Sequence, residues 1–176
     1  MDCKHPDREE CMKMLEEYNT PDHVVRHCIA VTEAAVLIGS ALNEKGFNFD
    51  IPLIRSAGLL HDIARVEKMH WESGADFVCK SGYLPESKII RRHMNHSFSP
   101  DPAELREIDM VCLGDRLILE DKYVGLDVRM DYVIKKAGGD KRIRDFINEK
   151  REISRILINN IENIIGVSLE ELINGA

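Results

Sequence analysis

The chain has 176 residues, of which 44% are hydrophobic and 31% charged, and its formal net charge is -7. These fractions are those of an ordinary globular protein, and the length is sufficient for one domain with its own core. The acidic balance excludes an overall basic surface for a nucleic-acid backbone, so we expect no nucleic-acid partner. We predict one domain over residues 1–176.

Targeting and redox features predict a cytoplasmic protein without membrane contact. The first ten residues are polar and charged, unlike a signal peptide, and no uninterrupted apolar run approaches the roughly 18 residues that span a bilayer. The five cysteines are an odd number and form no Cys-x-x-Cys pair. Cys28 and Cys112 lie in apolar periodic segments, where a free thiol packs as a small core residue, as is typical of a reducing compartment.

Nearly every segment has the periodicity of a helix, and no convincing strand pair or repeat is present, so we predict an all-α helical bundle. Residues 20–22 begin a long helix that reaches about residue 44, with Pro21 in its first turn. A helix over 51–65 is apolar nearly all round and should lie in the core. Other helices are predicted over 8–18, 70–80, 85–95, 103–120, 127–136 and 141–165, followed by a final turn that the capping box Ser168–Glu171 begins.

Ionisable side chains interrupt the apolar faces of these predicted helices, and Asp115 is the clearest case. It shares a helix face with Ile108, Val111, Cys112, Ile118 and Leu119. A buried, unpaired carboxylate is costly, so Asp115 needs a metal ion, hydrogen bonds or a salt bridge. A salt bridge to Arg92 or Arg116 explains Asp115 alone equally well.

Four histidines and a second aspartate are embedded in the same way. His61 and Asp62 follow two leucines in the predicted core helix, and His27, His70 and His93 each share a face with apolar neighbours. One such histidine is more often a satisfied core residue than a ligand. A set of six imidazole and carboxylate groups is more typical of a metal site, and suits iron, manganese, cobalt, nickel or zinc. We expect His5 and His23 at the surface or at helix caps.

The order and context of these residues resemble the HD superfamily of metal-dependent phosphohydrolases. Val24-Val25-Arg26-His27-Cys28 resembles the family's first-histidine helix, and Leu59-Leu60-His61-Asp62-Ile63-Ala64-Arg65 resembles its signature. Leu113-Gly114-Asp115-Arg116-Leu117 resembles the final-aspartate segment, where alanine is more usual than Gly114. The likeness covers roughly residues 21–120, which we expect to form an HD-like metal-binding core. Residues 121–176 are then C-terminal helices that pack on it and are candidates for selecting the substrate.

Two further histidines fit a subset of that family which often binds two metal ions. His70, four residues before Gly74-Ala75, and His93, at the end of Ile89-Ile90-Arg91-Arg92-His93, occupy the matching segments. The resemblance implies that a first metal ion is held by His27, His61, Asp62 and Asp115. It also implies that Asp62 bridges to a second ion, completed by His70 and His93.

The resemblance implies hydrolysis of a phosphate ester or anhydride by a metal-activated water, with a small phosphorylated molecule such as a nucleotide as the substrate. Asp62 and Arg65 are the expected catalytic residues, since Asp62 can orient the water and Arg65 can bind phosphate oxygens. Further substrate contacts are expected from Lys68, Arg92, His96 and Arg116. For Arg65 and each of these four residues, a solvated surface group is an equally good interpretation.

Two other hypotheses stay open. Some HD-fold proteins use a mixed-valent di-iron pair as oxygenases that cleave C–C or C–P bonds, and the same ligand set suits them. A non-catalytic helical module would use the polar cluster only structurally. Intact donors at all six positions argue against this last hypothesis.

Overall fold

The described part of the chain, residues 4–175 of the computed structural model, is mostly helical, and its strands are confined to one short hairpin. This confirms the predicted all-α class. The hairpin consists of β1 (Ile118–Leu119) and β2 (Lys122–Tyr123), and two short 3-10 helices are η1 (His93–Asn95) and η2 (Pro102–Glu104). The α-helices are α1 (Arg8–Glu17), α2 (Asp22–Asn43), α3 (Ile51–Leu60), α4 (His70–Lys80), α5 (Leu84–Arg92), α6 (Glu107–Asp115), α7 (Gly125–Lys136), α8 (Lys141–Ile165) and α9 (Leu169–Asn174).

Polar side chains cap several of the helix starts. Asp7, Asp50 and Asp140 accept hydrogen bonds from the first-turn amides of α1, α3 and α8. Ser168 and Glu171 form the predicted capping box at the start of α9. These caps satisfy amide groups that have no partner within the helix, which explains why the helices begin where they do.

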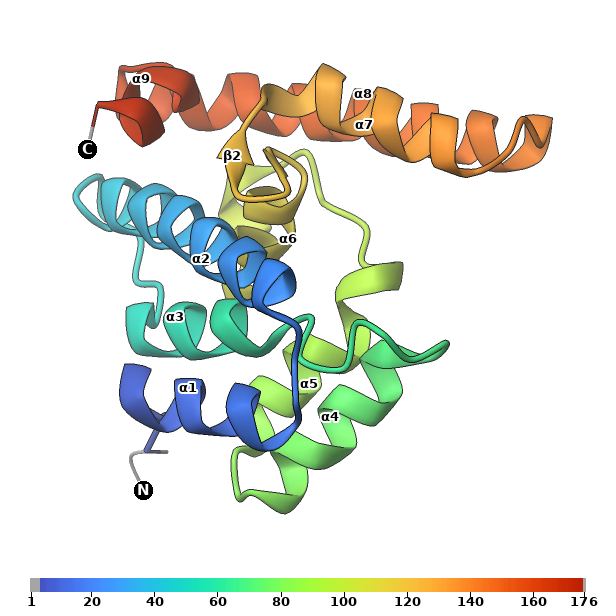
Figure 1. Cartoon of the computed structure of the whole chain (residues 1–176). Coiled ribbons are helices and arrows are strands. Elements are labelled where there is room, and N and C mark those ends of the chain that lie inside the picture. The colour runs from blue at the N-terminus through green and yellow to red at the C-terminus, as the bar shows by residue number, and fades with distance from the viewer. Residues whose placement is uncertain (1–3, 176) are drawn as a thin grey trace.

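Helix α2 lies at the centre of the arrangement and packs against both α3 and α6 (Figure 1). By length and composition it is the one described helix that is apolar enough to cross a membrane. Its apolar residues Val24, Cys28, Val31, Ile38 and Leu42 are buried against these neighbours. The apolar character of α2 is therefore accounted for by its place in the core.

The C-terminal helices pack onto this centre from one side. Helices α7 and α8 form an antiparallel pair along one edge of the molecule (Figure 1). Met130 from α7, Leu157 and Ile161 from α8, and Leu169 from α9 belong to the same buried cluster as residues of α2, α3 and α6. A second cluster joins α1 to α3, α4 and α5. The metal-ligand candidates lie in the segments between these two clusters.

The predicted helix over 103–120 is wrong at both ends, and so is the expectation that no strands pair. Helix α6 ends at Asp115, and the hairpin follows, with Ile118 opposite Tyr123 and Leu119 opposite Lys122. Glu120 has a φ of 57°, a left-handed conformation through which a helix does not continue. The apolar pair Ile118-Leu119 fits a helical and an extended pattern equally well, and this ambiguity caused the error.

Two other predicted helices are shorter than expected. Helix α3 ends at Leu60, so His61 and Asp62 lie in the turns that follow it. Helix α5 ends at Arg92 and passes into η1 at His93. In both cases, ligand candidates lie where a helix gives way to a less regular backbone.

The expectation that His5 is a surface residue is wrong, because its side chain is only 12% exposed. Its Nδ1 lies 2.6 Å from Oε1 of Glu86, and its Nε2 lies 3.1 Å from Oδ2 of Asp50. The Glu86 side chain is fully buried and also accepts a hydrogen bond from the Ser56 hydroxyl at 2.8 Å. His5 thus ties the N-terminal segment to α3 and α5. His23 is exposed, as expected.

The close packing of α6 against α2 explains why position 114 is glycine and not the more usual alanine. A Cβ atom at this position would lie 2.7 Å from the Val31 carbonyl oxygen, so glycine allows α6 to approach α2 closely. We expect Gly114→Ala to lower the free energy of unfolding by about 1–3 kcal/mol, because backbone must move to relieve the contact. Urea unfolding of the metal-free protein measures this. Cys79→Ala, at an exposed helical position, is the control, and equal stability of the two variants would contradict the close approach.

The His5 contacts make stability depend on pH. Burial disfavours the imidazolium, but Glu86 and Asp50 outweigh this effect and raise the pKa of His5 above its usual 6.5. A raised folded-state pKa gives stabilisation that is complete below the unfolded pKa, about 6.5, and is lost as the pH rises through the folded pKa. We therefore expect the stability difference between the native chain and His5→Gln to be larger at pH 5.5 than at pH 9. Thermal unfolding across this range measures it, and a pH-independent difference would be evidence against the interaction.

Candidate metal centre

The structure brings all six predicted ligands together. His27 comes from α2, His61 and Asp62 from the turns after α3, and Asp115 from the end of α6. His70 begins α4 and His93 begins η1. The donor atoms form two groups, within each of which all atoms lie no more than 4.8 Å apart: His27, His61 and Asp115, and then Asp62, His70 and His93.

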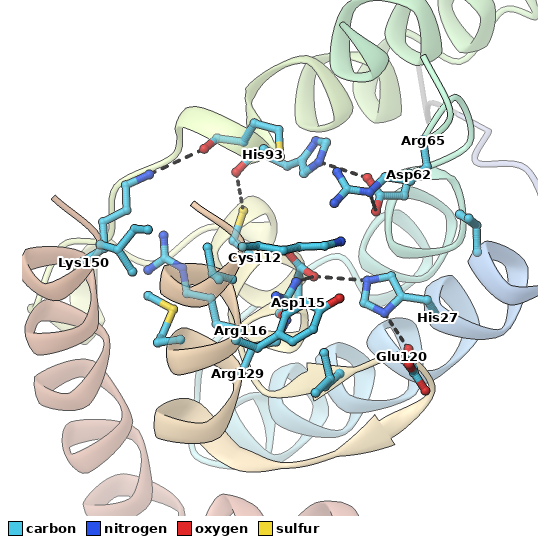
Figure 2. Close-up of a pocket in the computed structure, with 18 of the residues that line it drawn as sticks. His27, Asp62, Arg65, His93, Cys112, Asp115, Arg116, Glu120, Arg129 and Lys150 are labelled. Carbon is cyan, nitrogen blue, oxygen red and sulfur yellow. Dashed lines mark hydrogen bonds and ion pairs between the residues drawn. The ribbon is translucent and has the colours of Figure 1, made fainter. Parts of the chain in front are cut away.

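Asp62 lies between the two groups. Its Oδ2 is 3.7 Å from Nε2 of His61, in the first group. Its Oδ1 is 3.2 Å from Nε2 of His70 and 3.5 Å from Nε2 of His93. Figure 2 shows Asp62 directed toward His93 on one side of the pocket, with His27 and Asp115 in contact below it. One carboxylate thus presents an oxygen to each group, which is the arrangement of a bridging ligand.

Backbone carbonyls orient three of the imidazole rings. Nδ1 of His27 lies 2.7 Å from the Glu120 oxygen, Nδ1 of His61 lies 2.7 Å from that of Gly58, and Nδ1 of His93 lies 2.6 Å from that of Ile90. A carbonyl only accepts, so Nδ1 carries the proton in each ring. The lone pair of the neutral ring is then on Nε2, which is the atom that each ring directs into the cluster.

Two atoms at the centre of the cluster are buried without a hydrogen-bond partner, namely Nε2 of His61 and Oδ1 of Asp62. The neighbouring imidazole nitrogens lie close to Oδ1, but they are not aligned as hydrogen-bond donors. An unsatisfied buried polar atom is costly, whereas a bound cation would satisfy both atoms. The residues therefore fit a metal ion, and imidazole with carboxylate is a donor set for a divalent transition metal.

Charge in the cluster is distributed as a metal site requires. Burial lowers the pKa of His61 to about 4, so this ring is neutral and able to coordinate. Burial alone would raise the pKa of Asp62, but the surrounding imidazoles of His61, His70 and His93, together with the Arg65 guanidinium, hold it well below its usual value. Burial would also raise the pKa of Asp115, but the neighbouring His27 and Arg129 hold it below its usual value. Both carboxyl groups are therefore ionised at neutral pH.

Two arginines adjoin the cluster, of which the sequence indicated one. Nε of Arg65 lies 3.4 Å from Oδ2 of Asp62, and Nη1 lies 3.1 Å from Nε2 of His70, while the side chain is 42% exposed. Arg129 of α7 was not predicted, although it donates to the Asp115 carboxylate and carbonyl, both at 3.1 Å. It has no motif around it and nothing in the residues of α7 marks it, since the contact arises only from packing of α7 against the end of α6.

A pocket of about 750 Å³ opens over the cluster, and Arg65 and Arg116 are among its lining residues. Three other predicted substrate contacts are not: Lys68 is exposed in the turn before α4, and Arg92 and His96 border a separate, smaller pocket. Nε2 of His96 is hydrogen-bonded to Oδ1 of Asp109 at 2.6 Å. Lys68 and His96 lie outside the α-helices, where helical spacing does not determine the direction of a side chain, and Arg92 is the last residue of α5. Their contact with a substrate stays a prediction.

Arg116 contacts protein groups rather than open space. Its guanidinium donates to the Ser154 hydroxyl at 2.7 Å and to the His96 carbonyl at 3.1 Å, and it lies 4.0 Å from the centre of the Phe98 ring. These contacts connect α6 to α8 and to the segment after η1. They account for Arg116 as a structural residue at the pocket wall.

Comparison with known proteins agrees with this geometry. The sequence model described as HD domain matches residues 24–123, a stretch that contains all six candidate ligands. The chain belongs to the HD domain family. A relative from Methanocaldococcus jannaschii, described as an uncharacterized protein, is 31% identical, and the alignment covers 80% of this chain and 88% of the relative. HD domains bind divalent metal ions, in keeping with the clustered donors.

Two other relatives are each named tRNA (cytidine(56)-2'-O)-methyltransferase. The protein from Thermoplasma volcanium is 29% identical over 75% of this chain, and that from Picrophilus torridus is 24% identical over 79%. The alignments cover only 42% and 44% of these longer proteins. No solved structure is significantly similar to this HD-family chain.

The two groups of donors predict two metal ions per chain. We expect His93→Ala to bind one ion instead of two, because it removes a donor from the group around Asp62 but none from the group around Asp115. Elemental analysis of protein saturated with manganese and then desalted measures this. His23→Ala removes an exposed imidazole at the pocket and is the matched control. An unchanged count in His93→Ala would exclude His93 as a ligand.

Proposed function

We propose that the chain is a phosphohydrolase that cleaves a phosphate ester or anhydride of a small molecule, most simply a nucleotide, in the cytoplasm. The observation that carries this proposal is the pair of orphaned buried atoms, His61 Nε2 and Asp62 Oδ1, at the base of an open pocket. A site that only stabilised the fold would have no need to leave its central donors unsatisfied beneath a cavity.

His27, His61 and Asp115 would hold one divalent metal ion, His70 and His93 a second, and Asp62 would bridge them. When bound, such ions lower the pKa of water and neutralise phosphoryl oxygens. The chain's own contribution is to keep both carboxyl groups ionised and three imidazoles in the coordinating tautomer. It thereby provides preorganised donors that need little rearrangement when a substrate enters.

The pocket also supplies positive charge for a phosphate. Arg65 is half-exposed beside Asp62, so its guanidinium can bind substrate oxygens while it still contacts that carboxylate. Arg26, Lys136 and Lys150 line the same pocket in a chain whose net charge is -7. These basic side chains attract an anion into the pocket, and Arg65 is the one that lies beside the metal ligands. Asp62, with its low pKa, remains an acceptor that can orient an attacking water.

The names of the two methyltransferase relatives give limited support for a nucleotide. Those proteins act on a cytidine of tRNA according to their names. A related segment joined to such an activity is compatible with chemistry on nucleotides or RNA-derived phosphates. We propose a small nucleotide rather than a polymer, since the basic residues gather in the pocket while the whole chain is acidic.

A phosphate-release assay over a panel of nucleotides and sugar phosphates tests this function. We expect activity in the presence of manganese, cobalt or iron, loss of activity on chelation, and a fall in kcat of roughly 100-fold or more in Asp62→Asn. His23→Ala should retain activity. Oxygen consumption with an iron-loaded protein, and no phosphate release, would favour an oxygenase. Bound metal with neither reaction would favour a non-catalytic module.

A further inference from the structure

The pocket over the metal ligands has a second wall that the family match does not include. The match ends at residue 123, and helices α7 and α8 lie beyond it. Met130, Tyr132 and Val133 of α7 and Ile143, Phe146 and Ile147 of α8 all line the pocket. One wall therefore carries coordinating and charged groups, and the other carries large apolar side chains.

Several of these apolar side chains are exposed to an unusual degree. Phe146 is 55% exposed, Ile143 is 44% exposed and Tyr132 is 38% exposed, whereas Met130 and Ile147 behind them are buried in the core. Apolar side chains that are exposed together in a cavity indicate a surface that a ligand with an apolar part covers when it binds. The buried residues beneath hold this surface in place.

A lysine ammonium group lies over each aromatic ring of this wall. Nζ of Lys150 lies 4.7 Å from the centre of the Phe146 ring, and Nζ of Lys136 lies 5.3 Å from that of Tyr132. An ammonium group on one face of Phe146 leaves the other face free of that cation, and the side chain is 55% exposed. The wall thus combines a flat apolar surface with hydrogen-bond donors beside it.

The aromatic wall and the metal ligands lie at different ends of the pocket. Figure 2 shows Lys150 on the opposite side from Asp62, Arg65 and His27. Because Lys150 contacts the Phe146 ring, that ring also belongs to the far end. The volume of about 750 Å³ is in the range of sites for small molecules, so one ligand can reach both ends.

We propose that Phe146, flanked by Ile143 and Tyr132, forms a subsite that binds the flat aromatic ring of the substrate. Its ligand is a nucleoside monophosphate, with the phosphate beside Arg65 and the base stacked on the free face of Phe146. This inference rests on the proposed function for the position of the phosphate. Aromatic stacking accepts every base, and the ammonium of Lys150 on the other face of Phe146 adds positive charge to this end of the pocket.

The ring and the cations together distinguish this ligand from other apolar occupants. An acyl chain has neither a π face nor a polar group that could interact with the ammonium groups beside the aromatic rings. A sugar phosphate without a base would leave Phe146 uncovered. A nucleoside monophosphate satisfies both ends of the pocket, with an anion for Arg65 and a polarisable ring for Phe146.

Binding of two matched phosphonates tests the subsite without any turnover. One is adenosine 5'-monophosphate with a methylene in place of the ester oxygen, and the other is its ribose counterpart without the base. We expect manganese-loaded native protein to bind the adenosine compound about tenfold more tightly than the ribose compound, and Phe146→Ala to abolish this preference. Isothermal titration calorimetry measures both affinities. Phe146→Trp should keep the preference, because it retains an aromatic face.

Ile156→Ala is the matched control, since Ile156 is an exposed apolar residue of α8 outside the pocket. It should bind like the native chain. If Phe146→Ala keeps the preference for the adenosine compound, or if the native chain has none, the subsite is refuted even where phosphate esters are hydrolysed. A preference that depends on Phe146 in a protein that hydrolyses no ester would uphold the subsite and refute the proposed function.

Discussion

The structure depends on two ionised carboxylates and four imidazoles that converge on one place, where the central atoms His61 Nε2 and Asp62 Oδ1 have no hydrogen-bond partner in the protein. Neither kind of group is tolerated alone in a core, because an ionised carboxylate loses its hydration and a buried imidazole leaves a nitrogen unpaired. Here the backbone carbonyls of Gly58, Ile90 and Glu120 each accept a hydrogen bond from Nδ1 of one ring. Nε2 of each of these three rings is directed into the cluster. Each element that contributes a ligand is therefore held in position by a polar requirement as well as by apolar packing.

The sequence was informative where the signal was periodic and local. The inward positions of His27, His61, Asp62 and Asp115 followed from helical spacing, and the structure brings them together with His70 and His93. Spacing did not reveal Arg129, because its contact with Asp115 joins segments whose relative placement depends on the hairpin between them. Spacing also could not place Arg92, at the last position of α5, or His96, directly after η1, relative to the main pocket, and both border the smaller one.

The pocket is divided between two parts of the chain. Residues inside the family match supply the coordinating groups, and α7 and α8, outside it, supply the opposite wall. Arg116 connects these parts through Ser154 of α8 and the carbonyl of His96. The C-terminal helices can therefore vary in sequence on their pocket-facing side while the same contacts keep them against the core.

The β1–β2 hairpin has a consequence for how the chain tolerates changes in length. Its backbone carbonyl at Glu120 orients His27, its first strand follows Asp115 closely, and its second strand leads into the helix that carries Arg129. One inserted residue in this hairpin would displace all three groups at once. The turn between α7 and α8, where Gly138 and Gly139 have open space around them, positions none of these three groups. Insertions and deletions among relatives should thus accumulate at that distant turn and be absent from the hairpin.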